Sequence, residues 1–452
     1  MAEAAPKHKT EQYLEVLSQA LESGTVQHVR RIVNALHPAE IADLLESLPP
    51  PQRELVWELV DPDVDGEVLV HLGEEVRDSL TEEMDVQELV AAAEGMEVDD
   101  IADLLQGLPD AVTRETLESM DKQDRQRLEA VLSYPEDTAG GLMNTDVVTV
   151  RADVTLDVVL RYLRRRGEMP ETTDALMVVN RYDKYQGVLP LTHILTQDPD
   201  YTVAEVMDRT LEAIPATMQA NEVARLFEDR DLVSAAVVDD DARLIGRITV
   251  DDVLDVIRDE GEHSMMSMAG LTEEEDIFGP VLPSARRRAI WLGANLLTAF
   301  LASWVIGRFQ GTLEQIVALA VLMPIVASMG GIAGSQTLTL VIRGLAIGQV
   351  TSANTRWLMT KEVAVGALNG LTWALVVSLI AVLWFRNLEL GGIIATAMLI
   401  NLLCAALAGV AIPLVLRRMG IDPALAGTVV LTTVTDVIGF LAFLGLATVL
   451  MI

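Results

Sequence analysis

Five long apolar runs in the C-terminal part of the chain restrict its architecture more than any other feature. They span roughly residues 289–307, 315–340, 362–384, 391–416 and 424–452. Each run approaches or exceeds the about 20 residues that a helix needs to cross the hydrocarbon core of a bilayer. The sequence therefore predicts a transmembrane domain of five helices over residues 285–452, embedded in a lipid bilayer.

The charge of the chain is distributed very unevenly. Residues 1–285 carry 23 Lys and Arg against 62 Asp and Glu, whereas residues 286–452 carry ten against five. Such an acidic part lacks the basic patches that nucleic-acid binding needs, and it favours the attraction of cations. With Cys404 as the single cysteine, no intrachain disulfide can form. The first ten residues, MAEAAPKHKT, lack the apolar segment of a signal peptide, so the acidic part is expected in the cytosol.

Basic residues in the connections between the apolar runs predict the orientation. One side has Arg308 and Arg386 only. The other side has eight basic residues: Arg286, Arg287, Arg288, Arg343, Arg356, Lys361, Arg417 and Arg418. Because cytoplasmic connections carry the excess of Lys and Arg, the acidic part should lie inside and the C-terminus outside a plasma (inner) membrane.

A polar stripe lies within the last apolar run. Thr428, Thr432 and Asp436 are four residues apart and therefore share one helix face. A charged side chain at the bilayer centre costs about 2.5–3.5 kcal/mol on insertion scales, so such a carboxylate is a candidate functional group. We interpret it as a cation site on the two-fold axis of a homodimer, where two Asp436 carboxylates suit hydrated Mg²⁺. Alternatively, Asp436 is hydrogen-bonded to a neighbouring helix and the threonines bond their own backbone.

The second apolar run contains the glycine-rich segment GGIAGSQ, residues 330–336. Gly330 and Gly334 form a small-xxx-small pair that lets two helices approach closely, so a packing role is favoured. Gly331 and Gln336 belong to the same motif. Pro324, just before it, is expected to weaken the helix.

The acidic part begins with a region of polar, helical pattern, predicted as an N domain over residues 1–133. HPAEIADLLESLPP at 37–50 recurs as EVDDIADLLQGLPD at 97–110. Repeated helix pairs of this kind stack into a superhelical array. Three aspartates at the start of one such helix form a candidate metal site: Asp99, Asp100 and Asp103. Capping of the helix and a favourable dipole interaction are the alternative explanation.

Residues 134–257 change in character, since short β-branched runs alternate with helical ones. Residues 174–195 parallel residues 231–254, each predicting a strand, a turn with Gly187 or Gly246, a second strand and a helix. Such tandem units look like a pair of CBS domains, which often bind an adenine nucleotide.

A helix is expected to continue from residue 250 into a connecting region over residues 258–284. Its first part is rich in acids: Asp251, Asp252, Asp255, Asp259, Glu260 and Glu262. The predicted fold class is multidomain: an all-α acidic N-terminal superhelical domain, an α/β CBS-domain pair, a connecting helix and a five-helix transmembrane domain.

Four segments together resemble the MgtE family of magnesium channels and transporters. They are YPEDTAGGLM at 134–143, TVDDVLDVI at 249–257, GGIAGSQ at 330–336 and IDPALAGTVVLTTVTDVIG at 421–439. The resemblance covers essentially the whole chain in order. It implies Mg²⁺ uptake through a homodimer with a pore on its axis, a connecting helix that acts as a plug, and closure by bound cytosolic Mg²⁺.

The resemblance also implies roles for individual residues. Asp436 matches the pore aspartate of the family, and Asp422 matches the acid at the cytosolic start of the same helix. Sensor carboxylates of the family fall at Asp231, Asp252, Asp255 and Glu260. Together with the acids above, the candidate regulatory set is Asp99, Asp100, Asp103, Asp231, Asp251, Asp252, Asp255, Glu260 and Glu262.

The sequence departs from the family pattern at several positions. Ile332 follows the paired glycines where the family often has Asn, and the family can also carry Asn near Thr428. His263 and Ser264 stand where the plug helix commonly ends in Glu-Asp. The resemblance is thus closer at the pore than at the gate.

Other functional classes remain as alternatives. A secondary transporter for another divalent metal, such as Co²⁺ or Mn²⁺, would need a second coupling acid, for which Glu362 is a weak candidate. A membrane enzyme is not supported, because the membrane half contains no nucleophile–base constellation and no cluster of His and Cys. A CBS-regulated anion channel is opposed by the intramembrane carboxylate.

Overall fold

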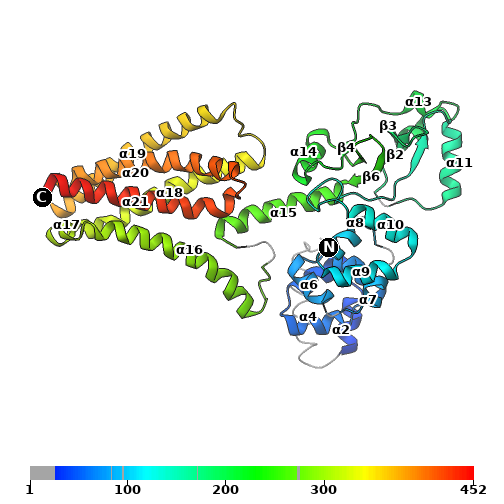
Figure 1. Ribbon diagram of the computed structural model, residues 1–452, viewed down its shortest axis with the longest axis horizontal. Helices are drawn as coiled ribbons and strands as arrows, with labels where there is room; N and C mark the ends of the chain where they lie inside the picture. Colours follow the sequence, from blue (N-terminus) through cyan, green and yellow to red (C-terminus); the bar gives the residue numbers. More distant parts are fainter. Residues whose placement is uncertain (1–25, 83, 94–95, 171, 272–274) are drawn as a thin grey trace, which may run out of the picture. The chain divides into compact units, whose positions relative to one another are not determined.

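The computed structural model describes residues 26–452 except 83, 94–95, 171 and 272–274. Parts of the predicted N domain (1–25) and of the predicted connecting region (272–274) therefore lie outside the described residues. Two compact units are present, one within residues 1–261 and 274–280 and the other within 262–273 and 281–452 (Figure 1).

The first unit begins with short helices. They are α2 (Val26–Val33), α3 (Pro38–Glu46), α4 (Pro50–Trp57), η1 (Pro62–Val64), α5 (Asp65–Val70), α6 (Glu74–Thr81), α7 (Val86–Ala93), α8 (Val98–Gln106), α9 (Asp110–Ser119) and α10 (Lys122–Val131). The predicted repeat corresponds to α3 and α8, each nine residues long, with Ile41 and Ile101 buried at equivalent positions. The all-α N-terminal domain is confirmed.

Two three-stranded sheets follow in the same unit. Their elements are β1 (Thr149–Arg151), α11 (Leu156–Arg166), β2 (Ala175–Val179), β3 (Tyr185–Pro190), α12 (Leu191–Thr196), α13 (Val203–Val206), β4 (Ile214–Pro215), α14 (Ala220–Arg230), β5 (Ser234–Val238), β6 (Leu244–Thr249) and α15 (Val250–Ala269). In both sheets the first strand is parallel and the third antiparallel to the central strand, in the orders β1-β2-β3 and β4-β5-β6. The tandem α/β units are confirmed.

The prediction that Gly187 and Gly246 lie in the turns is wrong. Both lie inside the third strand, where Gly187 pairs with Val178 and Gly246 with Val237, next to a register shift in each sheet. Another chain segment approaches each glycine closely. A Cβ on Gly246 would lie 2.9 Å from the carbonyl oxygen of Asn144, so a side chain does not fit there.

One hydrophobic core joins the last N-terminal helices to the second sheet. It includes Leu105 of α8, Val131 of α10, Phe227 of α14, Ile248 of β6 and Val253 of α15. Because these side chains are buried against each other, they hold the start of α8 near the start of α15. The acids at the two helix starts therefore belong to one packed region.

A buried ion pair fastens residues just before the first membrane helix to the N-terminal helices of the same unit. Arg53 of α4 and Asp276 have side chains that are 2% and 5% exposed, and their charged atoms are 2.8 Å apart. Arg53 also donates to the carbonyl oxygens of Leu45 and Leu48 at 3.0 and 3.1 Å. The backbone N–H of Asp276 donates to Glu75 at 2.5 Å.

Replacing Arg53 with Ala should destabilise this region by about 3–5 kcal/mol, because the Asp276 carboxylate would stay buried without its partner. The concentration of denaturant that makes the N-terminal helices susceptible to proteolysis measures the effect. Glu54→Ala on the exposed face of the same helix is the control and should change little. Equal resistance of the two variants would contradict the prediction.

The second unit contains the membrane helices. They are α16 (Val281–Gly307), α18 (Ala318–Ala346), α19 (Thr355–Phe385), α20 (Leu388–Arg418) and α21 (Pro423–Met451). All five are long and apolar enough to cross a membrane, which confirms the predicted number within the described residues. A short helix that was not predicted, α17 (Gln310–Gln315), lies between α16 and α18.

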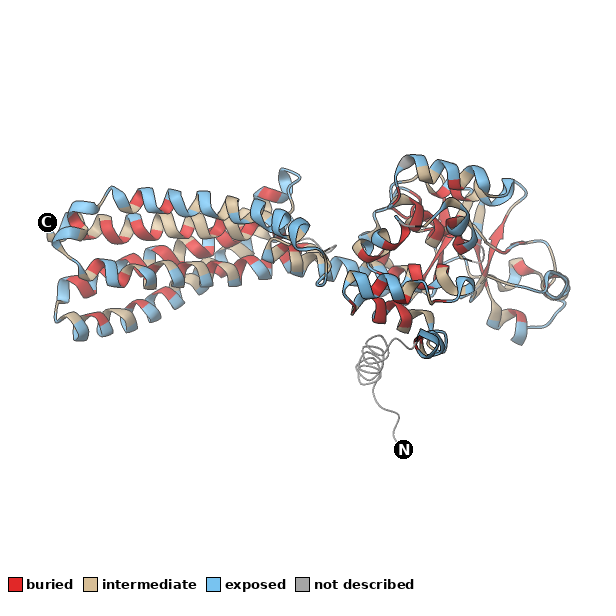
Figure 2. Ribbon diagram, turned by 90° about the horizontal axis from the view of Figure 1, so that it is seen from below, coloured by how far each residue is buried: buried red, intermediate tan, exposed pale blue. Residues whose placement is uncertain are grey.

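In the second unit, α18, α19 and α21 pack against α20, which has the largest buried share, and α16 packs against α21. Figure 2 shows exposed positions along the membrane helices. Trp304 of α16 and Leu383 of α19 are examples of such exposed residues. Exposed apolar side chains along helices of this length suit a lipid environment. Pro324 does not end α18, which continues through it, so the expected weakening produces no break.

Candidate functional site

The polar stripe on α21 has the geometry expected from its spacing. Thr428, Thr432 and Asp436 are all half-buried. The hydroxyl of Thr432 donates to the carbonyl oxygen of Thr428 at 3.0 Å, so this threonine bonds its own helix. Among the described residues, the Asp436 carboxylate has no hydrogen-bond or ion-pair partner. A carboxylate without a protein partner inside a membrane helix is suited to binding a cation.

The glycine-rich segment lies on α18 and packs against two other membrane helices. A Cβ on Gly330 would lie 2.8 Å from the side-chain carbon Cγ of Asn401, and one on Gly334 would lie 2.9 Å from Leu431. These distances leave no room for a methyl group, which suits a packing role. A Cβ on Gly331 would have no other heavy atom within 4 Å, and Gln336 is exposed, so neither residue takes part in this contact.

Asp422 caps the N-terminus of α21. Its carboxylate accepts hydrogen bonds from the backbone N–H groups of Ala424 and Leu425, at 2.8 and 3.3 Å. It also lies 3.2 Å from Nε2 of His263, which is near the end of α15. His263, one of the two residues that depart from the family pattern of acids, therefore contacts the acid at the start of the helix that carries Asp436.

Four carboxylates from the N-terminal helices and the second CBS unit form an acid cluster, defined as Asp99, Asp100, Asp103 and Asp252. Asp99 is 5% exposed, and one of its oxygens, Oδ2, is buried without a hydrogen-bond partner among the described residues. The amide of Asn144 donates to Glu97 at 2.5 Å and to Asp99 at 3.3 Å. Burial and repulsion from Asp252 raise the pKa of Asp99 well above its ordinary value.

The other members of the acid cluster titrate near neutral pH. Burial, followed by repulsion from Glu97 and Asp103, raises the pKa of Asp100 to about 7. Burial and then Glu136 raise the pKa of Asp103 to about 7. Burial also raises the pKa of Asp252 to about 7, although hydrogen bonds from Thr249 oppose the change. Closely spaced carboxylates that resist ionisation are the groups that a divalent ion would stabilise.

The helix-capping explanation for the N-terminal acids does not fit this geometry. The N-cap of α8 is Glu97, and its side chain makes no capping hydrogen bond. Asp99 accepts only from the next backbone N–H, at 3.2 Å, and from Asn144. The hydrogen bonds of Asp99 thus do not cap α8, although Asp99 and Asp100 lie in its first turn, where the helix dipole favours acids.

Several predicted sensor acids lie outside the acid cluster. Asp231 is the left-handed C-cap of α14 and is exposed, as are Glu260 and Glu262. Asp251 accepts hydrogen bonds from Thr249 and from Thr172. Asp255 is exposed and pairs with Arg258 at 3.4 Å. Among the described residues, no three His, Cys, Asp or Glu lie close enough together to hold a metal ion.

The sequence did not predict three residues that interact with the acid cluster. Glu97 and Glu136 act electrostatically on the acid cluster, and Asn144 hydrogen-bonds to it. Glu97 comes directly before α8 and is close in sequence to Asp99 and Asp100, and this proximity is a signal that the sequence holds. Asn144 and Glu136 come close only through the shared core, and nothing in their spacing indicates it.

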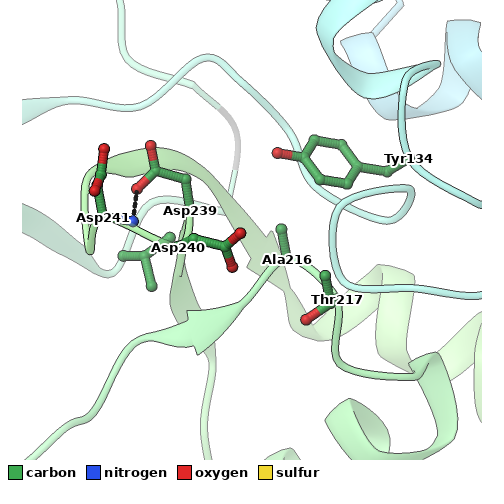
Figure 3. Close-up of a pocket in the computed structure, with 7 residues that line it drawn as sticks. Tyr134, Ala216, Thr217, Asp239, Asp240 and Asp241 are labelled. Carbon is green, nitrogen blue, oxygen red and sulfur yellow. Dashed lines mark hydrogen bonds between the residues drawn. The ribbon is translucent and has the colours of Figure 1, made fainter.

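A pocket of about 320 Å³ lies at the ends of β4 and β5, lined by Tyr134, Ala216, Thr217 and the consecutive residues Asp239–Asp241 (Figure 3). Asp239 accepts a hydrogen bond from the backbone N–H of Asp241 at 2.9 Å. Three carboxylates and no Lys or Arg line this pocket, so it would repel the phosphates of a nucleotide. A nucleotide on the CBS pair would need another surface.

Comparison with known proteins accounts for this organisation. A family model described as a divalent cation transporter matches residues 323–446, one for the MgtE intracellular N domain matches 36–137, and a CBS-domain model matches 139–199 and 203–259. A curated relative, the magnesium transporter MgtE of Thermus thermophilus, is 32% identical over 96% of this chain and 98% of its own length. The chain belongs to the MgtE family.

Two further MgtE relatives agree. The magnesium transporter MgtE of Bacillus subtilis is 26% identical over 95% of both chains. A crystal structure of the cytosolic domain of the Mg²⁺ channel MgtE, in complex with ATP, is 34% identical and covers 54% of this chain and 99% of its own, with a TM-score of 0.50. This chain is thus a multi-pass membrane transporter of the MgtE family with a cytosolic N-terminal domain.

The matched regions place the two candidate sites in different MgtE domains. The acid cluster combines Asp99, Asp100 and Asp103 of the N domain with Asp252 of the second CBS unit. Asp436 lies within the part that matches the transporter domain. The acid cluster and Asp436 therefore lie in different domains of the protein.

Proposed function

We propose that this chain carries Mg²⁺ across the membrane along a path that passes the Asp436 carboxylate. The observation that supports it is an uncompensated carboxylate in a membrane helix, within a family of divalent cation transporters. Mg²⁺ keeps several of its waters and needs few direct carboxylate ligands. Asp436 and the hydroxyls of Thr428 and Thr432, on the same helix face, would line the path.

The proposed regulatory ion is Mg²⁺ from the cytosol, bound by the acid cluster. Aspartate oxygens are the ligands that Mg²⁺ prefers, and Asp99 has an oxygen without a partner among the described residues. Since no three acids among the described residues lie close enough together to hold an ion, binding would need a small movement of α8 toward the start of α15. Bound Mg²⁺ would remove the repulsion between the carboxylates of the two helices. The exposed acids Asp231, Asp255, Glu260 and Glu262 would contribute only after such a rearrangement.

The assembly proposed for transport is a homodimer with its axis at α21. A single chain offers one Asp436, and a second copy would supply the facing carboxylate. The excess of basic residues on one side of the helices supports an inner-membrane orientation with the C-terminus outside.

The CBS pair is proposed to bind an adenine nucleotide, by likeness to the relative whose structure holds ATP.

A secondary transporter for Co²⁺ or Mn²⁺ is the second candidate. Its coupling site would need another membrane acid, for which Glu362 is the candidate. Glu362 is 4% exposed, accepts a hydrogen bond from Thr337 at 3.1 Å and pairs with Lys361 at 2.6 Å. A carboxylate with these partners is better suited to holding α18 and α19 together than to exchanging ions.

Ion flux into liposomes that contain the purified chain tests the proposal. Mg²⁺, Co²⁺, Mn²⁺ and Ca²⁺ are compared over a range of concentrations, with and without a gradient of monovalent cation. We expect Mg²⁺ flux that does not depend on that gradient. Flux of Co²⁺ or Mn²⁺ that stops when the gradient is removed would favour the secondary transporter.

Restoring acids at the gate should strengthen inhibition by Mg²⁺. In the variant that combines His263→Glu with Ser264→Asp, residue 263 would face the Asp422 carboxylate, 3.2 Å from the present imidazole. The two acids would repel each other without Mg²⁺ and be bridged with it. The Mg²⁺ concentration that halves the flux should fall. An unchanged value would mean that the chain closes through other contacts, such as Glu260 and Glu262.

A further inference from the structure

A single amide side chain lies where three membrane helices meet. Asn401, near the middle of α20, is 0% exposed. Its Nδ2 donates to the carbonyl oxygen of Val326 on α18 at 2.8 Å. This bond connects α20 to the turn of α18 that precedes the paired glycines.

Two glycines from different helices leave the space that this amide occupies. A Cβ on Gly330 of α18 would lie 2.8 Å from Cγ of Asn401, and a Cβ on Gly439 of α21 would lie 3.1 Å from the same atom. In folded proteins, a Cβ atom essentially never lies as close as 2.8 Å to another heavy atom, and seldom as close as 3.1 Å. Gly439 is three residues beyond Asp436 and thus about one helical turn away. The amide therefore separates α18 from the turn of α21 next to the path carboxylate.

The amide is not the most stable choice for this position. Its Oδ1 is buried and has no hydrogen-bond partner among the described residues. Leaving a buried acceptor unsatisfied costs folding free energy, whereas a leucine of similar volume would carry no such group. A polar side chain at such a place is better explained by the geometry that it imposes than by stability.

We propose that Asn401 is a positioning residue for ion transport. Its amide sets the distance between α18 and α21, and thereby the position that the Asp436 carboxylate takes along the path. The inference rests on the proposed function, because it assigns Asn401 a role through Asp436. The readouts are ion affinity and ion selectivity, which replacement of a purely structural residue would leave unchanged.

The first test compares Asn401→Leu with the wild type for the Mg²⁺ concentration at half-maximal flux and for the ratio of Mg²⁺ to Ca²⁺ flux. Thermal unfolding and dimer content should match or exceed those of the wild type, since the unsatisfied oxygen is removed. Half-maximal flux should need about tenfold more Mg²⁺, as expected for a coupling of about 1.4 kcal/mol between contacting residues. Wild-type affinity and ion ratio in Asn401→Leu would overturn the inference.

A double-mutant cycle supplies a test that does not depend on how well one variant folds. Gly439→Ala should reduce flux, because the added methyl meets the Asn401 amide, and Asn401→Ala in the same chain should restore part of it. Gly445→Ala on the same helix is the matched control, since its Cβ would meet only Phe309 at 4.0 Å. Additive effects of Gly439→Ala and Asn401→Ala would overturn the inference. Absence of Mg²⁺ flux in the wild type would instead overturn the proposed function.

Discussion

Replacing Asp436 with Asn should abolish most divalent-ion flux while the chain still folds and inserts. The change keeps the shape of the side chain and removes one charge from each chain. At roughly 4 Å and an effective dielectric constant near 20, each carboxylate contributes about 4 kcal/mol per unit charge of the ion. Hydration of the ion offsets part of this, yet a net loss of about 2 kcal/mol would already lower ion occupancy roughly thirty-fold.

Two variants on the same helix serve as controls for Asp436→Asn. Asp436→Glu keeps the charge and should retain more flux, with altered selectivity because the longer side chain narrows the path. Thr432→Val should have a smaller effect, because the hydroxyl already donates to the Thr428 carbonyl. Wild-type Mg²⁺ flux in Asp436→Asn would show that the carboxylate is structural.

The second large effect concerns pH and Mg²⁺ in the cytosolic half. Members of the acid cluster have pKa values raised to about 7 in the folded chain. An acid with a raised pKa binds more protons in the folded state than in the unfolded state. Without divalent ions, the contribution of these acids to the free energy of unfolding should therefore be greatest below about pH 4. It should fall as the pH rises from about 4 through about 7.

Between about pH 4 and pH 7, each of Asp100, Asp103 and Asp252 contributes up to about 1.4 kcal/mol of destabilisation per pH unit. Mg²⁺ that binds only the folded, ionised cluster should reverse this loss, so its stabilising effect should be larger at pH 8 than at pH 6. Protection of the full chain from protease at the two pH values, with EDTA or millimolar Mg²⁺, measures both effects.

Substitution of Asn at Asp100, Asp103 and Asp252 together is the matched variant. It should flatten the pH dependence and remove most of the extra protection by Mg²⁺, because neutral amides neither repel each other nor attract the ion. The same number of substitutions at exposed acids outside the cluster, Asp200, Asp229 and Asp240, provides the control. Digestion rates that are equal with and without Mg²⁺ in the wild type would contradict a regulatory role for the acid cluster.

The features that sequence predicted well depend on local periodicity. The five membrane helices follow from the length of their apolar runs, and the common face of Thr428, Thr432 and Asp436 follows from the helical repeat. The repeat of α3 and α8 follows from nearly identical apolar spacing. Such patterns act within one element and need no knowledge of its neighbours.

The features that sequence did not predict depend on contacts between elements. The approach of His263 to Asp422 joins positions 159 residues apart, and no spacing rule indicates it. The frequency of glycine in turns predicts turns at Gly187 and Gly246, whereas both lie in strands at positions where another backbone segment approaches too closely for a side chain. Asn401 lies in an apolar run, and only the packed helices reveal that two glycines leave space for its amide.

Mg²⁺ uptake by liposomes, with the Mg²⁺ concentration facing the soluble half set to micromolar or millimolar, tests the central claim most directly. We expect rapid uptake at micromolar Mg²⁺, and uptake slower by about tenfold or more at millimolar Mg²⁺, within the usual range of coupling between distinct sites. Uptake at the same rate under both conditions would contradict regulation by cytosolic Mg²⁺. No uptake under either condition would contradict transport itself.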